Sequence, residues 1–244
     1  MSEGKGVLPS CIGFVGGLGV GATVYYYEHL AKAFVTRGVT PRLIISHADV
    51  ALVLTHIKSN ALDSLADYLA SHIDSLERAG ADFAAIGAVA AHICAPKLKA
   101  RIGVPLVDVI DCTRTELTRR GARRVAVLGT KFVMQSDMYG QLYGFDVIRL
   151  ASDSLERVNA NYAKIVANGA LHGSGADIEY ILTAAQEVVR NKGVDVVVLA
   201  GTELSIAFNE ADCGFPAIDC ARVHLDAIIG RAFTQMAESE KQHE

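Results

Sequence analysis

Few features of this sequence indicate nucleic acid or a membrane as a partner. Charged residues make up 20% of the 244 residues, and the formal net charge is −4. A chain without a basic excess lacks the electrostatic footprint of a nucleic-acid-binding protein. The longest apolar run, residues 83–96, contains His92 and is too short to cross a bilayer. We therefore expect neither kind of partner.

The cysteines lack the spacing of a disulfide framework or a zinc site. They are odd in number, and no CxxC or Cys/His pattern joins them: Cys11, Cys94, Cys112, Cys213 and Cys220. Such usage favours reduced thiols and a cytoplasmic location. Glycines interrupt the first apolar stretch, residues 11–22, so a signal peptide is not expected. No ligand cluster or lysine context indicates a metal or pyridoxal phosphate, and we expect no cofactor.

Short apolar segments alternate with amphipathic ones along the whole chain. This alternation predicts an α/β fold with parallel sheets, whose sites lie beyond the carboxyl ends of the strands. Helical spacing of apolar residues is clearest over 60–79 and 177–191, each followed by a glycine. The segments that we expect to be strands are 11–15, 42–46, 83–89, 106–109, 125–129, 146–150, 194–200 and 217–219.

The two halves of the chain resemble each other. The segment ERAGADFAAIGAVAAH matches VRNKGVDVVVLAGTEL in order and spacing. We interpret this as a duplicated architecture, in which two similar parallel-sheet lobes face each other across an active-site cleft. The first lobe is predicted to contain 1–112 plus 209–244, and the second 113–208.

A glycine-rich turn, residues 16–23, follows the first expected strand. Glycine there lets a ligand approach the backbone, and the next helix offers its N-terminus to an anion. Gly17, Gly19 and Ala22 formally match a dinucleotide fingerprint, but the acidic residue expected about 20 positions on is missing. The turn favours a small carboxylate, with dinucleotide binding and a purely structural turn as alternatives.

Several segments resemble aspartate/glutamate racemases. They occur in the family's order over nearly the whole chain: IGFVGGLGVGATVYYYEHL, GADFAAIGAVAAH, VPLVDVIDCT, VAVLGTKFVMQSDMYG and GVDVVVLAGTEL. The resemblance implies the racemase-like fold, cofactor-independent proton transfer and a homodimer. Tyr25-Tyr26-Tyr27 favours packing and a dimer interface over a cofactor stack.

The residues that carry the family's chemistry are absent. In the family, one cysteine follows each of two strands and the two thiols exchange a proton on opposite faces of the substrate. The corresponding positions here are Ala88 and Gly201, neither of which can carry a proton. Val53 stands near the place of an arginine that clamps a carboxylate in the family. The usual two-thiol mechanism is therefore excluded.

Two residues are candidate replacements for the thiols. His47 ends the second expected strand, and imidazole titrates near neutrality. Asp49 is close enough in sequence to orient it. Glu203 lies beside the second lost cysteine and could serve as acid or base. The structural alternatives are a solvated loop histidine and a first-turn helix carboxylate.

The residues expected to bind the substrate are Gly17, Leu18, Thr130, Thr202 and His92. The alternative for His92 is a cap on the following helix. Cys94, two residues further, is expected in the core.

The sequence as a whole favours a racemase-like isomerase acting on a small carboxylate or related metabolite without the two-cysteine mechanism. Isomerisation, epimerisation and elimination all fit one acid and one base. Racemisation of aspartate or glutamate is not expected. The main alternative is a non-catalytic small-molecule-binding homologue that lost the chemistry, and a nucleotide-dependent enzyme is the weaker one.

Overall fold

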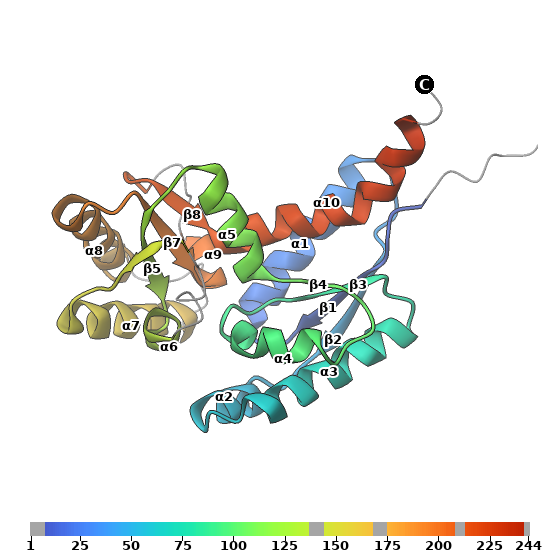
Figure 1. Cartoon of the computed structure of the whole chain (residues 1–244), viewed down its shortest axis with the longest axis horizontal. Helices are drawn as coiled ribbons and strands as arrows, with labels where there is room; N and C mark the ends of the chain where they lie inside the picture. The colour runs from blue at the N-terminus through green and yellow to red at the C-terminus, as the bar shows by residue number, and fades with distance from the viewer. Residues whose placement is uncertain (1–7, 137–143, 168–174, 208–212, 242–244) are drawn as a thin grey trace, which may run out of the picture.

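The chain forms two α/β lobes that lie side by side in the computed structural model (Figure 1), which describes residues 8–136, 144–167, 175–207 and 213–241. The elements up to α5 are β1 (Ile12–Gly16), α1 (Val20–Thr36), β2 (Leu43–His47), α2 (Val50–Lys58), α3 (Leu62–Arg78), β3 (Phe83–Ile86), the 3₁₀ helix η1 (Ala90–Cys94), α4 (Ala95–Lys99), β4 (Leu106–Val107) and α5 (Val109–Arg119). The remaining elements are β5 (Arg124–Gly129), α6 (Lys131–Gln135), β6 (Asp146–Ile148), α7 (Ser152–Ala167), α8 (Gly175–Lys192), β7 (Val196–Ala200), α9 (Thr202–Ala207), β8 (Ala217–Asp219) and α10 (Cys220–Lys241).

Both lobes contain a parallel sheet of the same order. The first is β2-β1-β3-β4 and the second is β6-β5-β7-β8. Every pairing between neighbouring strands is parallel. The duplicated α/β architecture predicted from the sequence is therefore confirmed, and β3 and β7 hold equivalent places in their sheets.

One predicted strand ends earlier than its apolar run. The segment expected to be extended over 83–89 leaves the sheet after Ile86 and enters η1. A Cβ at Gly87 would lie 2.5 Å from Cζ of Phe14, so only glycine fits beside that ring. The apolar run continues because Val89, Ala91 and Cys94 are buried as well. Hydrophobicity alone could not show where strand gives way to helix.

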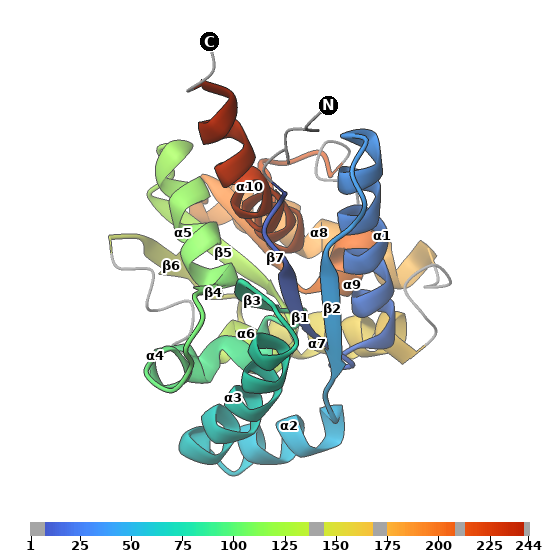
Figure 2. The same cartoon turned by 90° about the vertical axis from the view of Figure 1, so that its right-hand side faces the viewer.

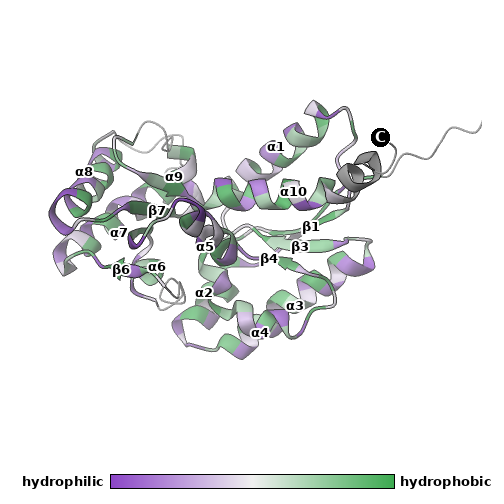
Figure 3. Ribbon diagram, turned by 45° about the horizontal axis from the view of Figure 1, so that its top comes forward, coloured by the Kyte–Doolittle hydropathy of each residue, from purple (hydrophilic) through white to green (hydrophobic). Residues whose placement is uncertain are grey.

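The hydrophobic core lies on both faces of both sheets, and the strands are largely hydrophobic in Figure 3. One cluster joins the lobes, since Val89 and Val109 pack in it together with Val125 and Val198 of the second sheet. Burial of such side chains contributes about 25 cal/mol per Å² of apolar surface removed from water. The lobes are therefore held together by a shared core.

The last helix returns to the first lobe. Figure 2 shows α10 above the first sheet and beside α1, and Leu225 and Ile228 pack in the same cluster as Ile12 and Phe14. The predicted lobe division is wrong at 217–219. These residues were assigned to the first lobe, but they form β8, which pairs with β7 in the second sheet. This strand has three residues, too few for its pattern to indicate a sheet. Residues 209–212 lie outside the described residues.

Candidate active site

The glycine turn follows β1 at the carboxyl edge of the first sheet. Thr23 in α1 holds its shape: its Oγ1 accepts a hydrogen bond from the Gly17 N–H at 2.9 Å and donates one to the Gly19 carbonyl at 2.9 Å. Gly17 has a φ of +82°, which disfavours any other residue. The Gly17 amide is thus used within the turn, and an anion here would need other donors. Leu18 is half-buried and packs against the first-lobe core.

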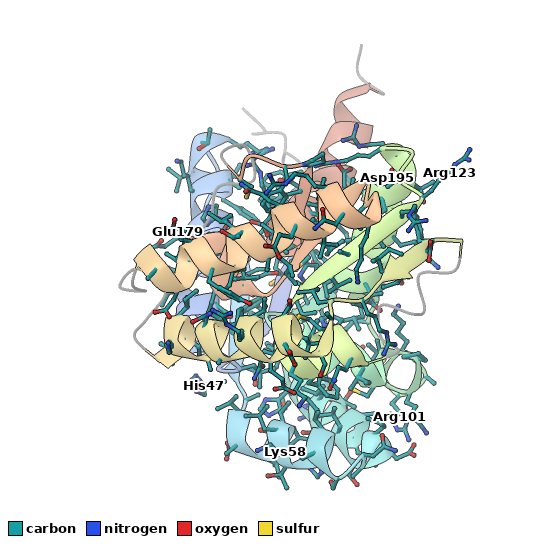
Figure 4. All side chains as sticks on the ribbon, turned by 90° about the vertical axis from the view of Figure 1, so that its left-hand side faces the viewer. His47, Lys58, Arg101, Arg123, Glu179 and Asp195 are labelled. Carbon is teal, nitrogen blue, oxygen red and sulfur yellow. The ribbon has the colours of Figure 1, made fainter. Side chains whose placement is uncertain are left out.

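His47, at the end of β2, lies against this turn. Its ring atoms Cδ2 and Nε2 are 2.6 and 2.8 Å from the point where a Cβ on Gly17 would stand. The side chain is exposed, and Figure 4 shows it at the outer edge of the molecule between the second-lobe helices and the α2 region. The sequence prediction that His47 lies at the end of the second strand agrees with this position.

Asp49 caps helix α2, a role that the sequence analysis did not predict. Its Oδ1 accepts hydrogen bonds from the backbone N–H groups of Ala51 and Leu52, at 2.8 and 3.3 Å, and so caps α2. Unpaired helix N–H groups two and three residues on bind this oxygen, and orientation of His47 by Asp49 stays a prediction. His72, which shares a 2.7 Å hydrogen bond with Ser46, has its pKa lowered by burial and then by the nearby charge of His47.

Glu203 approaches the same turn from the second lobe. It lies in the first turn of α9, directly after β7. Its Oε1 is 3.0 Å from the point where a Cβ on Gly19 would stand, and its Oε2 accepts a 2.6 Å hydrogen bond from the Tyr162 hydroxyl. The neighbouring Thr202 is buried, with 4% of its surface exposed. The turn is therefore flanked by titratable side chains from both lobes, His47 and Glu203.

Tyr162 is the residue of this region that the sequence analysis missed. It lies in α7, whose sequence carries no motif, and its side chain is 5% exposed. A Cβ on Gly201 would stand 2.3 Å from its hydroxyl oxygen. The one available signal was indirect: a glycine where the resemblance implies a side chain leaves a space that another residue must fill.

Thr130 and His92 are held by local hydrogen bonds. Thr130 caps α6 by accepting a bond from the Val133 N–H at 3.3 Å. His92 is 2% exposed, and its Nδ1 donates to the Ala88 carbonyl at 2.9 Å. Neither η1 nor the following α4 has a side-chain capping hydrogen bond, so the structure does not show His92 as a helix cap. Substrate contacts by either residue remain predictions.

Two further sequence expectations concern the family's lost side chains. Ala88 is half-buried just after β3, at the place equivalent to Gly201 after β7. Val53 is 4% exposed and belongs to the first-lobe core, so its side chain faces that core.

The cysteines are thiols in hydrophobic surroundings. Cys94, Cys112, Cys213 and Cys220 pack in or against four different clusters. Burial raises the pKa of Cys94 and of Cys112 to about 12, so both thiols are neutral near pH 7. The core position predicted for Cys94 is confirmed.

Within the described ranges, no three His, Cys, Asp or Glu side chains gather as a metal ion would require. Over the same ranges, no helix is long and apolar enough to span a membrane.

Comparison with known proteins identifies the fold. The family model described as Asp/Glu/Hydantoin racemase matches residues 15–228. A Yersinia pestis protein provisionally described as an Asp/Glu racemase superposes with a TM-score of 0.80 at 22% identity, over 92% of this chain and 99% of its own. An aspartate racemase homologue from Pyrococcus horikoshii OT3 gives 0.77 at 27% identity, over 91% and 99%. Aspartate racemase from Picrophilus torridus gives 0.71 at 21% identity, over 91% and 94%.

Proposed function

Because this chain belongs to the Asp/Glu/Hydantoin racemase family, we propose that it is a racemase-like isomerase that moves a proton at a carbon beside a carboxylate in a small metabolite. The proposed reaction uses no cofactor and no pair of thiols, since Ala88 and Gly201 carry no proton. Epimerisation, isomerisation and elimination all fit one acid and one base. A homodimer in the cytoplasm is part of the same proposal.

One observation carries the proposal: two titratable side chains from different lobes lie against one glycine turn. The His47 ring contacts Gly17, and Glu203 Oε1 lies beside Gly19, two residues on. Consecutive Cα atoms are about 3.8 Å apart, so a turn of this length separates the two groups by a distance that a small molecule spans. Two groups so placed can remove a proton and return it at a different position.

The start of α1 supports carboxylate binding at the same turn. The helix begins at Val20, and its N-cap is Gly19, which makes no side-chain capping hydrogen bond. The N-terminus of a 17-residue helix carries partial positive charge and favours an anion. A carboxylate held there would present its α-carbon to His47 and Glu203, and Thr202 would lie at the border of the site.

The test is exchange of carbon-bound hydrogen in deuterated water. A panel of small hydroxy, amino and dicarboxylic acids is incubated with the protein and followed by proton NMR. We expect exchange on at least one acid and a loss of about 100-fold or more in Glu203→Gln, since a positioned acid or base contributes 10²–10⁴-fold. Glu179→Gln, an exposed carboxylate on α8 labelled in Figure 4, is the matched control and keeps full exchange.

The outcomes separate the alternatives. Binding of acids without exchange of any of them would favour the non-catalytic binding protein. Tight binding of NAD or NADP would favour the nucleotide-dependent enzyme. We expect no racemisation of either enantiomer of aspartate or glutamate, and turnover of either would contradict the thiol-independent part of the proposal.

A further inference from the structure

The phenol of Tyr162 occupies the space that a side chain at position 201 would need. Three phenol atoms of Tyr162 lie within 2.9 Å of the point where a Cβ on Gly201 would stand, and the hydroxyl oxygen is nearest at 2.3 Å. Real side chains never approach so closely. Any larger residue at 201 would displace the phenol, so the missing side chain after β7 is what admits Tyr162 from α7.

The phenol also fixes Glu203. Tyr162 donates its hydroxyl hydrogen to Oε2 at 2.6 Å, a short charge-assisted bond. The other oxygen, Oε1, is the one beside Gly19. The two carboxylate oxygens therefore face different partners, one the phenol of the second lobe and the other the glycine turn of the first.

Tyr162 is suited to donating a hydrogen bond and unsuited to moving a proton. Burial raises the pKa of its phenol well above 10, and the negative charge of Glu203 raises it further. A phenol in this state keeps its hydrogen throughout the neutral range. It remains a constant donor, and Glu203 is left as the group that exchanges protons.

We infer that Tyr162, lodged in the space of the missing side chain at 201, is the positioning residue that aims Glu203 at the ligand on the glycine turn. This inference rests on the proposed function and deepens it: the carboxylate takes over at the second-lobe face of the substrate, and a phenol from a neighbouring helix supports it. The site thereby replaces a reactive side chain directly after β7 with a pair contributed by α7 and α9.

Tyr162→Phe tests the inference, because it retains the ring and removes only the hydroxyl. We expect kcat for exchange to fall about 10–100-fold with KM changed less than about threefold, as when an aimed catalytic group loses its alignment. Tyr180→Phe, on α8 beside Arg157, is the matched control and leaves both readouts unchanged.

A second measurement does not depend on turnover. Carbon-13 NMR of labelled glutamate at pH 7 records the chemical shift of the Glu203 carboxyl carbon, identified by its absence in Glu203→Gln. We expect this chemical shift to change in Tyr162→Phe, because the carboxyl group loses its hydrogen-bond donor, and to stay in place in Tyr180→Phe. An unchanged chemical shift and an unchanged kcat in Tyr162→Phe would overturn the inference.

These results are distinguishable from failure of the proposed function. If the wild-type protein exchanges none of the acids but the carboxyl chemical shift changes in Tyr162→Phe, the Tyr162–Glu203 pair stands and the proposed isomerase falls. If Tyr162→Phe fails to fold, Tyr162→Leu replaces it for the NMR measurement. A changed chemical shift supports the inference there too, and an unchanged one overturns it.

Discussion

Tyr26 and His224, 198 positions apart, share a buried 2.9 Å hydrogen bond between the phenol hydroxyl and Nδ1. The imidazole Nε2 donates to the Val107 carbonyl, also at 2.9 Å. With that tautomer, Nδ1 accepts the hydrogen of Tyr26. The neutral imidazole thus connects α10, α1 and the end of β4, and it joins the returning helix to the first lobe by polar contacts as well as apolar ones.

This arrangement predicts a stability that falls in acid. Burial lowers the pKa of His224 from 6.5 to about 3, with a further lowering by His92. Below pH 6.5 the imidazole of His224 is protonated in the unfolded chain, whereas in the folded protein it stays neutral down to about pH 3. The free energy of unfolding therefore decreases as the pH falls from 6.5 to about 3. The slope from one such group reaches about 1.4 kcal/mol per pH unit.

Urea unfolding of His224→Gln at several pH values measures this contribution. The variant is less stable at pH 7, and its stability depends less on pH between about 6.5 and 4. Carboxylates contribute to the slope in both proteins, so the difference between them is the informative quantity. His29→Gln, at an exposed position, keeps the wild-type slope. Equal slopes in all three proteins would rule out a buried neutral His224.

Restoring a side chain at 201 should destabilise the protein. In Gly201→Cys the new Cβ would meet the Tyr162 hydroxyl at 2.3 Å, and overpacking of this kind costs about 1–3 kcal/mol. Ala88→Cys adds only a sulfur to an existing Cβ at a half-buried position and should cost less. Urea denaturation compares the two.

A double variant tests the steric origin of that cost. In Gly201→Cys/Tyr162→Ala, the loss of stability should be smaller than the sum of the single losses, because the removed ring frees the space. Strictly additive losses would show that the side chains at 201 and 162 do not compete for the same space.

Because a side chain at 201 has no room beside Tyr162, a cysteine at 201 cannot take the place of the family's thiol. We therefore expect that Ala88→Cys/Gly201→Cys with Tyr162 retained does not recover racemase activity.

Gly17 should tolerate no side chain. A Cβ there would stand 2.5 Å from the Ala48 carbonyl and 2.6 Å from the His47 ring, in a backbone conformation with φ +82°. Gly17→Ala should lose about 1–3 kcal/mol of stability and lower the exchange rate by displacing His47. Gly21→Ala is the control, since its nearest neighbour is 3.8 Å away and alanine favours the helix. Equal stability of both variants would contradict this account of the turn.

The thiols should be slow to react in the folded protein. Burial raises the pKa of Cys94 and of Cys112 to about 12, so only a very small fraction of either thiol is ionised at pH 8. Alkylation by iodoacetamide should be roughly 100-fold slower than for free cysteine and should become fast in urea. Peptide mass spectrometry reads the modification site by site. Rapid labelling of either residue in the native state would contradict the buried, neutral thiols described above.

The sequence by itself determined the alternation of strands and helices, the duplication of the lobes and the family. These properties are local or repetitive: apolar periodicity records which face of an element is buried, and the glycine turn and Glu203 belong to short motifs. His47 could be placed at the end of β2 for the same reason. The local pattern also excluded a thiol at 88 and at 201.

Only the tertiary structure decided what surrounds those positions. Tyr162 reaches Gly201 because α7 packs beside β5 and α9, a relation that no pattern within α7 encodes. Proximity in sequence suggested Asp49 as a partner of His47, and only the structure showed that its Oδ1 caps α2. Packing brings together side chains separated by many positions, and its geometry depends on how all the helices sit on the sheets. For that reason the sequence could show that position 201 lacks a side chain, but it could not show that Tyr162 occupies the space beside it.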